Sequence, residues 1–263
     1  MPVRSKRIPY LAALCAGAVA LIVVFSLLHS PAARAQSATF QVAQHGHAVG
    51  TASFAITAAP GGYHSTSLVR VSMQGLAYAL SKDERLTAAH HLVQAQLSAT
   101  VNSSAVELTA KPQSGQVQLD ISANGRKSST RLPGHAGAVL LPDFDPGGLQ
   151  TLLTLAVRQN SRDLWAIIPR RAGSMDAVQL ATYQDMQGTL NGNPVTVHHL
   201  VATIGGVKTD LFSGPQNQLL QAELPQEGFA LVRQGFVLKP PAKAPAAPPQ
   251  QPASSQPPPS TQE

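Results

Sequence analysis

The sequence predicts a mainly β protein: a single strongly curved antiparallel sheet, a meander of about ten to twelve strands, with one helix packed on its concave face. Three observations support this fold class. Apolar and polar residues alternate along much of the chain, which is typical of strands with one buried face. Turn-forming residues recur at short intervals, and one segment in mid-chain has apolar residues at helical spacing.

The first 35 residues predict an export signal. A basic start precedes an apolar stretch at 11–28 and Ala33-Arg34-Ala35, a small-x-small cleavage site. The apolar stretch has 18 residues, the lower limit for a membrane-spanning helix, so an uncleaved signal anchor is the alternative. Pro31 breaks this helix and favours cleavage after Ala35. Either way residues 36–263 reach the periplasm or cell envelope, because the basic flank stays inside.

The composition excludes two classes of function. The only cysteine, Cys15, lies in the leader, so the exported chain forms no disulfide and has no thiolate ligand or cysteine nucleophile. Four of the 19 basic residues also belong to the leader, which leaves 15 Lys and Arg against 13 Asp and Glu. A net charge of +2 creates no basic field for phosphates, so we expect no nucleic-acid partner.

Alternation defines the strands of the exported domain. Val69 and Val71 point to one side of a strand, and the segments 106–109 and 117–121 alternate in the same way. Asn124-Gly125 and Asn191-Gly192 predict two-residue hairpins, since the primed turns need positive φ at both positions. The segment 86–97 fits both a helix and a strand, and the strands on either side favour a strand.

The helix is predicted over residues 146–160. Asp145 can cap it, and Pro146 suits the first turn, where its missing N–H is not needed. We expect the leucine face of this helix to pack on the sheet. The apolar residues at helical spacing are Leu149, Leu152, Leu153, Ala156 and Val157.

The chain ends in a segment of different composition. From Lys239 to Glu263, nine of 25 residues are proline and no large apolar side chain occurs. Such a segment cannot bury enough surface to offset its ordering entropy, so we predict a disordered tail that serves as a spacer, as a docking segment or without a function. Residues 36–238 remain for one β-rich domain, which is long enough for a single core.

The late run from Leu211 to Arg233 contains a strand, the Gln216-Asn217 turn and a closing hairpin around residues 228–233. Together with the export signal, the meander and the helix, it resembles uncharacterised secreted bacterial domains with the architecture of the periplasmic lipoprotein carriers (LolA-like). The resemblance is one of pattern over about 200 residues. It implies a concave apolar surface that holds an acyl chain or an apolar partner segment, and it transfers no functional residue.

Histidine is the only unusual reactive residue type after the leader. His45 and His47 have the spacing at which one strand offers two metal ligands, but the sequence identifies no third ligand. His198 and His199 point to opposite faces of a strand and cannot chelate one ion together. We therefore expect no metal, with turn or surface histidines at 45 and 47 and a half-buried, hydrogen-bonded His199.

Catalytic motifs are missing from the sequence. Asp143-Phe144-Asp145 begins like a calcium loop, but the remaining oxygen ligands are absent and capping explains Asp145. The chain has no G-x-S-x-G, S-x-x-K, H-E-x-x-H or glycine-rich phosphate loop. We predict no enzymatic activity and no cofactor. An envelope hydrolase is the weakest alternative, and it would need a histidine, a carboxylate and a hydroxyl in one cleft.

The predicted function is the binding of an apolar ligand, such as an acyl chain, or of an apolar partner segment or envelope component. Contact with a membrane is expected only through residues 11–28, if the leader is not cleaved. The alternative is a structural or interaction scaffold with a docking tail. A cavity of about 300 Å³ or more favours the binder, and a filled interior favours the scaffold. The candidate lining residues, whose other role is ordinary core, are Leu149, Leu152, Leu153, Val157 and Trp165.

Overall fold

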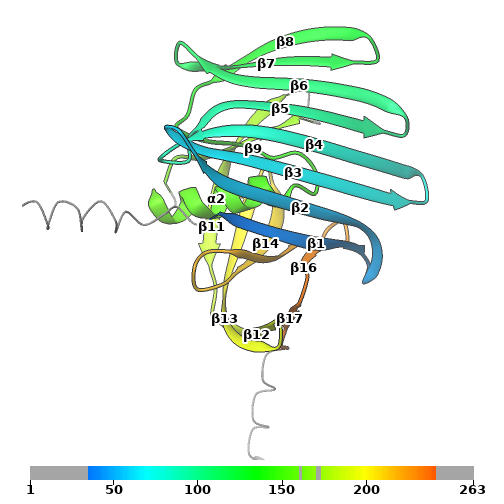
Figure 1. Cartoon of the computed structure of the whole chain (residues 1–263), viewed down its shortest axis with the longest axis vertical. Coiled ribbons are helices and arrows are strands. Elements are labelled where there is room, and N and C mark those ends of the chain that lie inside the picture. The colour runs from blue at the N-terminus through cyan, green and yellow to red at the C-terminus, as the bar shows by residue number, and fades with distance from the viewer. Residues whose placement is uncertain (1–34, 160–161, 170–172, 241–263) are drawn as a thin grey trace, which may run out of the picture.

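The structure, a computed structural model, describes residues 35–159, 162–169 and 173–240 (Figure 1). The predicted leader up to residue 34, with its apolar stretch, and the tail from residue 241 onward lie outside the described residues. Within the described ranges, no helix is both long and apolar enough to cross a membrane.

The described part of the chain contains 17 strands and the helix α2. The first nine strands are β1 (Gln36–Gln44), β2 (His47–Ala59), β3 (Gly62–Met73), β4 (Leu76–Thr87), β5 (Leu92–Val101), β6 (Ser104–Gln113), β7 (Gln116–Ala123), β8 (Arg126–Pro133) and β9 (Gly137–Leu140). After α2 (Pro146–Arg158) follow β10 (Leu164–Ile168), β11 (Ser174–Thr182), β12 (Met186–Leu190), β13 (Asn193–Ile204), β14 (Val207–Ser213), β15 (Leu219–Leu224), β16 (Phe229–Arg233) and β17 (Phe236–Leu238).

Strands β1 to β8 form an antiparallel meander in chain order, visible as the upper part of Figure 1. Their turns follow the predicted chemistry: Asn124 has a φ of 51° and Gly125 a φ of 75°, as the primed two-residue hairpin requires. The ambiguous segment 86–97 is strand on both sides of a turn, because β4 ends at Thr87 and β5 begins at Leu92. The strand interpretation of this segment is therefore confirmed.

The C-terminal strands β13 to β16 form a second antiparallel run. β16 pairs with β1, with Leu231 opposite Val42, and this pairing joins the two runs into one sheet. β12 and β17 pair with each other beside β13 and cover a second, smaller core. Its buried residues are Val197, Phe212, Leu220 and Phe236.

The sheet is mixed, which corrects the expectation of antiparallel pairing throughout. β9 and β10 run parallel, with Ala138 opposite Trp165, because α2 connects them as a crossover and returns the chain to the same end of the sheet. In the described residues β8 pairs only with β7 and β9 only with β10, so the sheet does not close. The 17 strands exceed the predicted number, since strands as short as β9, β12 and β17 show too little alternation to be recognised.

Helix α2 begins and ends close to the predicted positions. The Asp145 side chain accepts the main-chain N–H of Gly147 at 2.9 Å, and Pro146 occupies the first turn, as expected. The helix packs against β2, β3, β9, β10 and β15, so it lies between the two antiparallel runs. Leu152 and Leu155 are fully buried there and belong to the main core.

Candidate functional site

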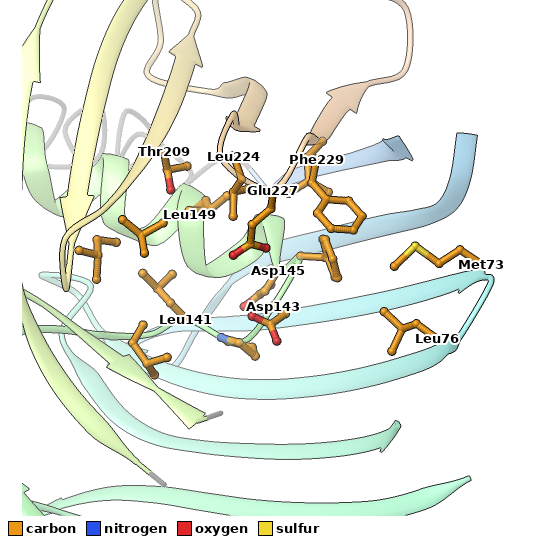
Figure 2. A pocket seen from close by; sticks show the side chains of 16 residues that line it. Met73, Leu76, Leu141, Asp143, Asp145, Leu149, Thr209, Leu224, Glu227 and Phe229 are labelled. Carbon is orange, nitrogen blue, oxygen red and sulfur yellow. The ribbon is translucent and has the colours of Figure 1, made fainter. Parts of the chain in front are cut away.

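A pocket of about 250 Å³ lies at the N-terminal end of α2 (Figure 2). Its walls come from the β3–β4 turn, the loop between β9 and α2, and the β13–β14 and β15–β16 hairpins. Twelve of its sixteen lining residues are apolar, so the surface suits an apolar molecule. Figure 2 shows the carboxyl groups of Asp143 and Glu227 among the apolar side chains, with Asp145 beside them; the Asp145 side chain itself is fully buried.

The structure separates the five predicted lining residues. Leu149 lines the pocket, whereas Leu152 and Leu153 are buried in the main core. Val157 is 60% exposed near the C-terminal end of α2. Trp165 is half-buried on β10, where its ring stacks on His135 and its Nε1–H donates to Asp163. The leucine face of α2 therefore mostly fills the core. The pocket forms at one end of the helix from the 141–145 loop and from strands that are distant in the sequence, which periodicity does not reveal.

The loop between β9 and α2 forms one wall of the pocket in an unusual conformation. Phe144 has a φ of 58°, in the left-handed region that bulky residues rarely adopt. Its ring packs edge-on against Phe229, with centroids 4.9 Å apart, and against Tyr78 at 6.0 Å. Because such backbone strain persists only where the surroundings impose it, and clusters at ligand-binding sites, Phe144 marks this loop as a functional candidate.

Tyr78 supports the same loop from β4. Its hydroxyl donates to the main-chain oxygen of Asp143 at 3.4 Å. Burial raises the pKa of Tyr78, and the negative charges of Asp143 and Asp145 raise it further. The phenol therefore stays protonated, as a donor to the loop requires.

A cluster of buried charges lies behind this wall. The Lys82 ammonium is 2.6 Å from Asp145 Oδ2 and 3.2 Å from Glu84 Oε2. It also donates to the main-chain oxygen of Leu140 at 3.4 Å. All three charged residues are at most 1% exposed. Buried charges are costly unless they are paired, so this cluster is the feature of the interior that most needs an explanation.

The cluster contains one ammonium and two carboxyl groups. Burial opposes the charge on Lys82, but Asp145 and Glu84 together outweigh burial and raise its pKa. Burial raises the pKa of Glu84; Lys82 works against this shift and Asp145 adds to it. Electrical neutrality of the cluster needs one proton on a carboxyl group, and Glu84 has the environment that favours this proton.

Two serines extend the cluster onto β3. Ser67 lies opposite Lys82 and Ser65 opposite Glu84, and both are at most 1% exposed. A serine beside a lysine is also the residue pair of a Ser–Lys dyad, in which a neutral lysine activates an accessible serine. Here the lysine is held as an ammonium by two carboxyl groups, and no substrate reaches either side chain. The pair therefore does not act as nucleophile and base.

Four of the eight histidines in the described ranges pair with aspartates. The four pairs are His64 with Asp83 at 2.6 Å, His135 with Asp163 at 3.3 Å, His198 with Asp185 at 2.9 Å and His199 with Asp210 at 2.7 Å. The ring of His199 also stacks on Phe212, which confirms it as a half-buried, hydrogen-bonded residue. In the described ranges, no three His, Cys, Asp or Glu residues are grouped so that they could hold a metal ion. His45 and His47 are exposed at the β1–β2 turn.

Comparison with known proteins identifies no relative: no family model, no curated protein and no solved structure matches the chain. The site is therefore characterised by its own geometry, an apolar pocket with the buried charged residues Lys82, Glu84 and Asp145 at its wall.

Proposed function

We propose that the protein binds an apolar ligand, such as a single acyl chain, in the pocket at the N-terminal end of α2. The observation that carries this proposal is the predominantly apolar lining; the space of about 250 Å³ lies just below the lower end of ligand-site volumes, about 300 Å³. In this proposal the sheet is strongly curved, with α2 on its concave face. The export signal predicted at residues 1–35 delivers the protein to the periplasm or envelope, where acyl chains are at hand.

The strained wall of the pocket adds support. A left-handed Phe144 between Tyr78 and Phe229 costs about 1–3 kcal/mol of backbone strain. The ring lies in the wall of the pocket, where contact with a ligand would compensate for this strain.

The second candidate function is a structural or interaction scaffold. It is favoured by the filled interior around α2, where Leu152 and Leu155 are fully buried, and by a pocket somewhat smaller than the usual range. A scaffold would use the outer surface or the proline-rich tail for its contacts, and the pocket would be a packing imperfection.

The test compares two valine-to-tryptophan variants. Val207→Trp, on the β13–β14 hairpin, fills the pocket, and Val237→Trp is the matched control because Val237 is 62% exposed on β17. The proteins are purified from their own envelope and analysed by native mass spectrometry, followed by lipid extraction. We expect an apolar species on the wild type and on Val237→Trp, and its loss from Val207→Trp. Equal loading of all three proteins would contradict binding in this pocket, and no loading of any would favour the scaffold.

A further inference from the structure

Resting on the proposed function, we propose that Lys82 and Glu84 are positioning residues of the pocket. They hold the loop 141–145 in the shape that accepts the ligand, and a proton on Glu84 maintains that shape. Neither side chain lines the pocket, so both act through the loop.

The Lys82 ammonium contacts both ends of this loop. It donates to the main-chain oxygen of Leu140, directly before the loop, and it forms an ion pair with Asp145, the last loop residue. Every residue from Leu141 to Asp145 lines the pocket. Through these two contacts, the position of the ammonium affects both ends of the wall.

Asp145 transmits the position of Lys82 to the helix. Its Oδ1 accepts the Gly147 N–H at 2.9 Å, while its Oδ2 faces Lys82. Gly147 lies directly against β3, because a Cβ there would meet the Ser67 hydroxyl. The first turn of α2, the loop and the charge cluster thus form one connected unit.

The protonation of Glu84 decides the charge of this unit. The charged groups facing Glu84 are Lys82 on its own strand and Asp145, while Asp83 lies on the outer face of β4. Its cross-strand neighbours, Ser65 of β3 and Ala95 of β5, carry no charge. With a neutral Glu84, Lys82 and Asp145 neutralise each other. With a charged Glu84, two carboxylates compete for one ammonium, and the hold on the loop weakens.

Two neighbouring serine hydroxyls could accept this proton, although neither is hydrogen-bonded to Glu84 in the structure. In the described part of the chain, the buried hydroxyl oxygens of Ser65 and Ser67 have no hydrogen-bond partner, and they lie on the same face of the sheet as Glu84. Burial raises the pKa of Glu84 above its ordinary value of 4.5, so the proton is retained into the range above that pH.

The test measures ligand affinity as a function of pH. The probe is N-phenyl-1-naphthylamine, an uncharged fluorescent molecule, titrated into wild type, Glu84→Gln and Asp83→Asn. Asp83→Asn is the matched control, because it removes an exposed carboxylate from the adjacent position of β4. We expect the affinity of the wild type and of Asp83→Asn to fall roughly fivefold or more as the pH rises through the titration of Glu84, the size typical of coupling between two sites. Glu84→Gln, which imitates the protonated carboxyl, should keep its affinity.

A second measurement follows the first turn of α2 as a function of pH in the absence of a ligand. The ¹⁵N-labelled amide of Gly147 reports on the Asp145 side chain, and its signal should move with pH in the wild type but not in Glu84→Gln. Equal pH profiles of affinity in wild type and Glu84→Gln, or equal movement of the Gly147 signal, would overturn the inference. If the probe binds at no pH while the Gly147 signal behaves as expected, the proposed function fails and the positioning of the loop is upheld.

Discussion

The side-chain oxygen of Gln150 on α2 accepts the main-chain N–H of Leu219 in β15 at 2.8 Å. The same side chain donates through Nε2 to the main-chain oxygen of Asn217 at 2.9 Å. Gln150 is 1% exposed, and the register between β14 and β15 shifts at this point. The buried amide thus satisfies backbone groups that the strand ladder leaves unpaired, and it ties α2 to the C-terminal strands.

Replacing Gln150 by leucine should destabilise the protein by about 2–3 kcal/mol. The substitution keeps most of the volume but leaves the Leu219 N–H and the Asn217 carbonyl buried without partners. Urea unfolding followed by circular dichroism measures the free energy of unfolding. Gln41→Leu, at an exposed position of β1, is the control and should change stability by less than about 0.5 kcal/mol. Equal effects of the two substitutions would show that Gln150 has no such structural role.

Removal of the buried ammonium should cost more than removal of the whole charge cluster. Lys82→Met leaves Asp145 and Glu84 buried without their cation, and we expect a loss of about 3–5 kcal/mol. The triple variant Lys82→Met, Glu84→Gln, Asp145→Asn removes all three ionisable groups and keeps a good helix cap, so it should recover most of this loss. The free energies of unfolding at neutral pH compare the two proteins. A triple variant as unstable as Lys82→Met would mean that lost packing, and not unpaired charge, dominates.

The sequence predicts the helix and most long strands because these elements are periodic and are bounded by strong signals. Asp145 and Pro146 mark the start of α2, and Asn124-Gly125 marks a hairpin. The order of neighbouring strands can be predicted for the meander β1 to β8, because short turns join consecutive strands. The pairings of β1 with β16 and of β9 with β10 could not be predicted, because they join segments that are far apart in the chain.

The site was harder to predict than the fold. The pocket is built from loops and hairpin ends, which carry no periodic signal. The charge cluster did leave a signal: Lys82 and Glu84 share the strand face of Leu80 and Leu86, all buried, while Asp83 and Arg85 point outward. A charged run such as Lys82–Arg85 nevertheless resembles a solvent-exposed strand. Only the structure shows that the inward-facing Lys82 has Asp145 as a partner.

Acid should destabilise the protein through His90. Its ring stacks on Tyr63 with centroids 4.2 Å apart, and the residue is 7% exposed. Burial lowers the pKa of His90 from 6.5 to about 4, and the charges of Arg158 and His91 contribute. At pH values between about 4 and 6.5, His90 is protonated in the unfolded chain but neutral in the native state. The contribution of His90 to the free energy of unfolding is therefore fully present above about pH 6.5, and it is lost as the pH falls towards about 4.

The variant His90→Asn isolates this effect, because asparagine tolerates the positive φ of 64° at this position. Between pH 6.5 and pH 4, the wild type should lose about 2 kcal/mol more stability than the variant. His45→Asn, at an exposed turn position with a φ of 48°, is the control and should keep the acid sensitivity of the wild type. Parallel pH profiles for wild type and His90→Asn would exclude His90 as the cause.

Gly147 should be required by its contact with β3 and not by its backbone conformation. Its φ is not positive, so alanine would ordinarily favour the helix by about 1 kcal/mol. A Cβ at this position would meet the Ser67 hydroxyl and lie 3.2 Å from Phe54 Cβ. We therefore expect Gly147→Ala to destabilise the protein by about 1–3 kcal/mol.

A double-mutant cycle tests whether the loss of stability in Gly147→Ala comes from the contact with Ser67. Ser67→Ala removes the colliding hydroxyl, so Gly147→Ala should cost at least about 1 kcal/mol less in this background than in the wild type. Gly148→Ala is the control, because its Cβ would lie 2.8 Å from the main-chain oxygen of Leu140 and from Asp145 Oδ2, which Ser67→Ala does not move. Rescue of Gly147→Ala alone would locate the contact between α2 and β3 at Ser67. Rescue of both glycine variants, or of neither, would mean that the helix end is held by the loop and not by β3.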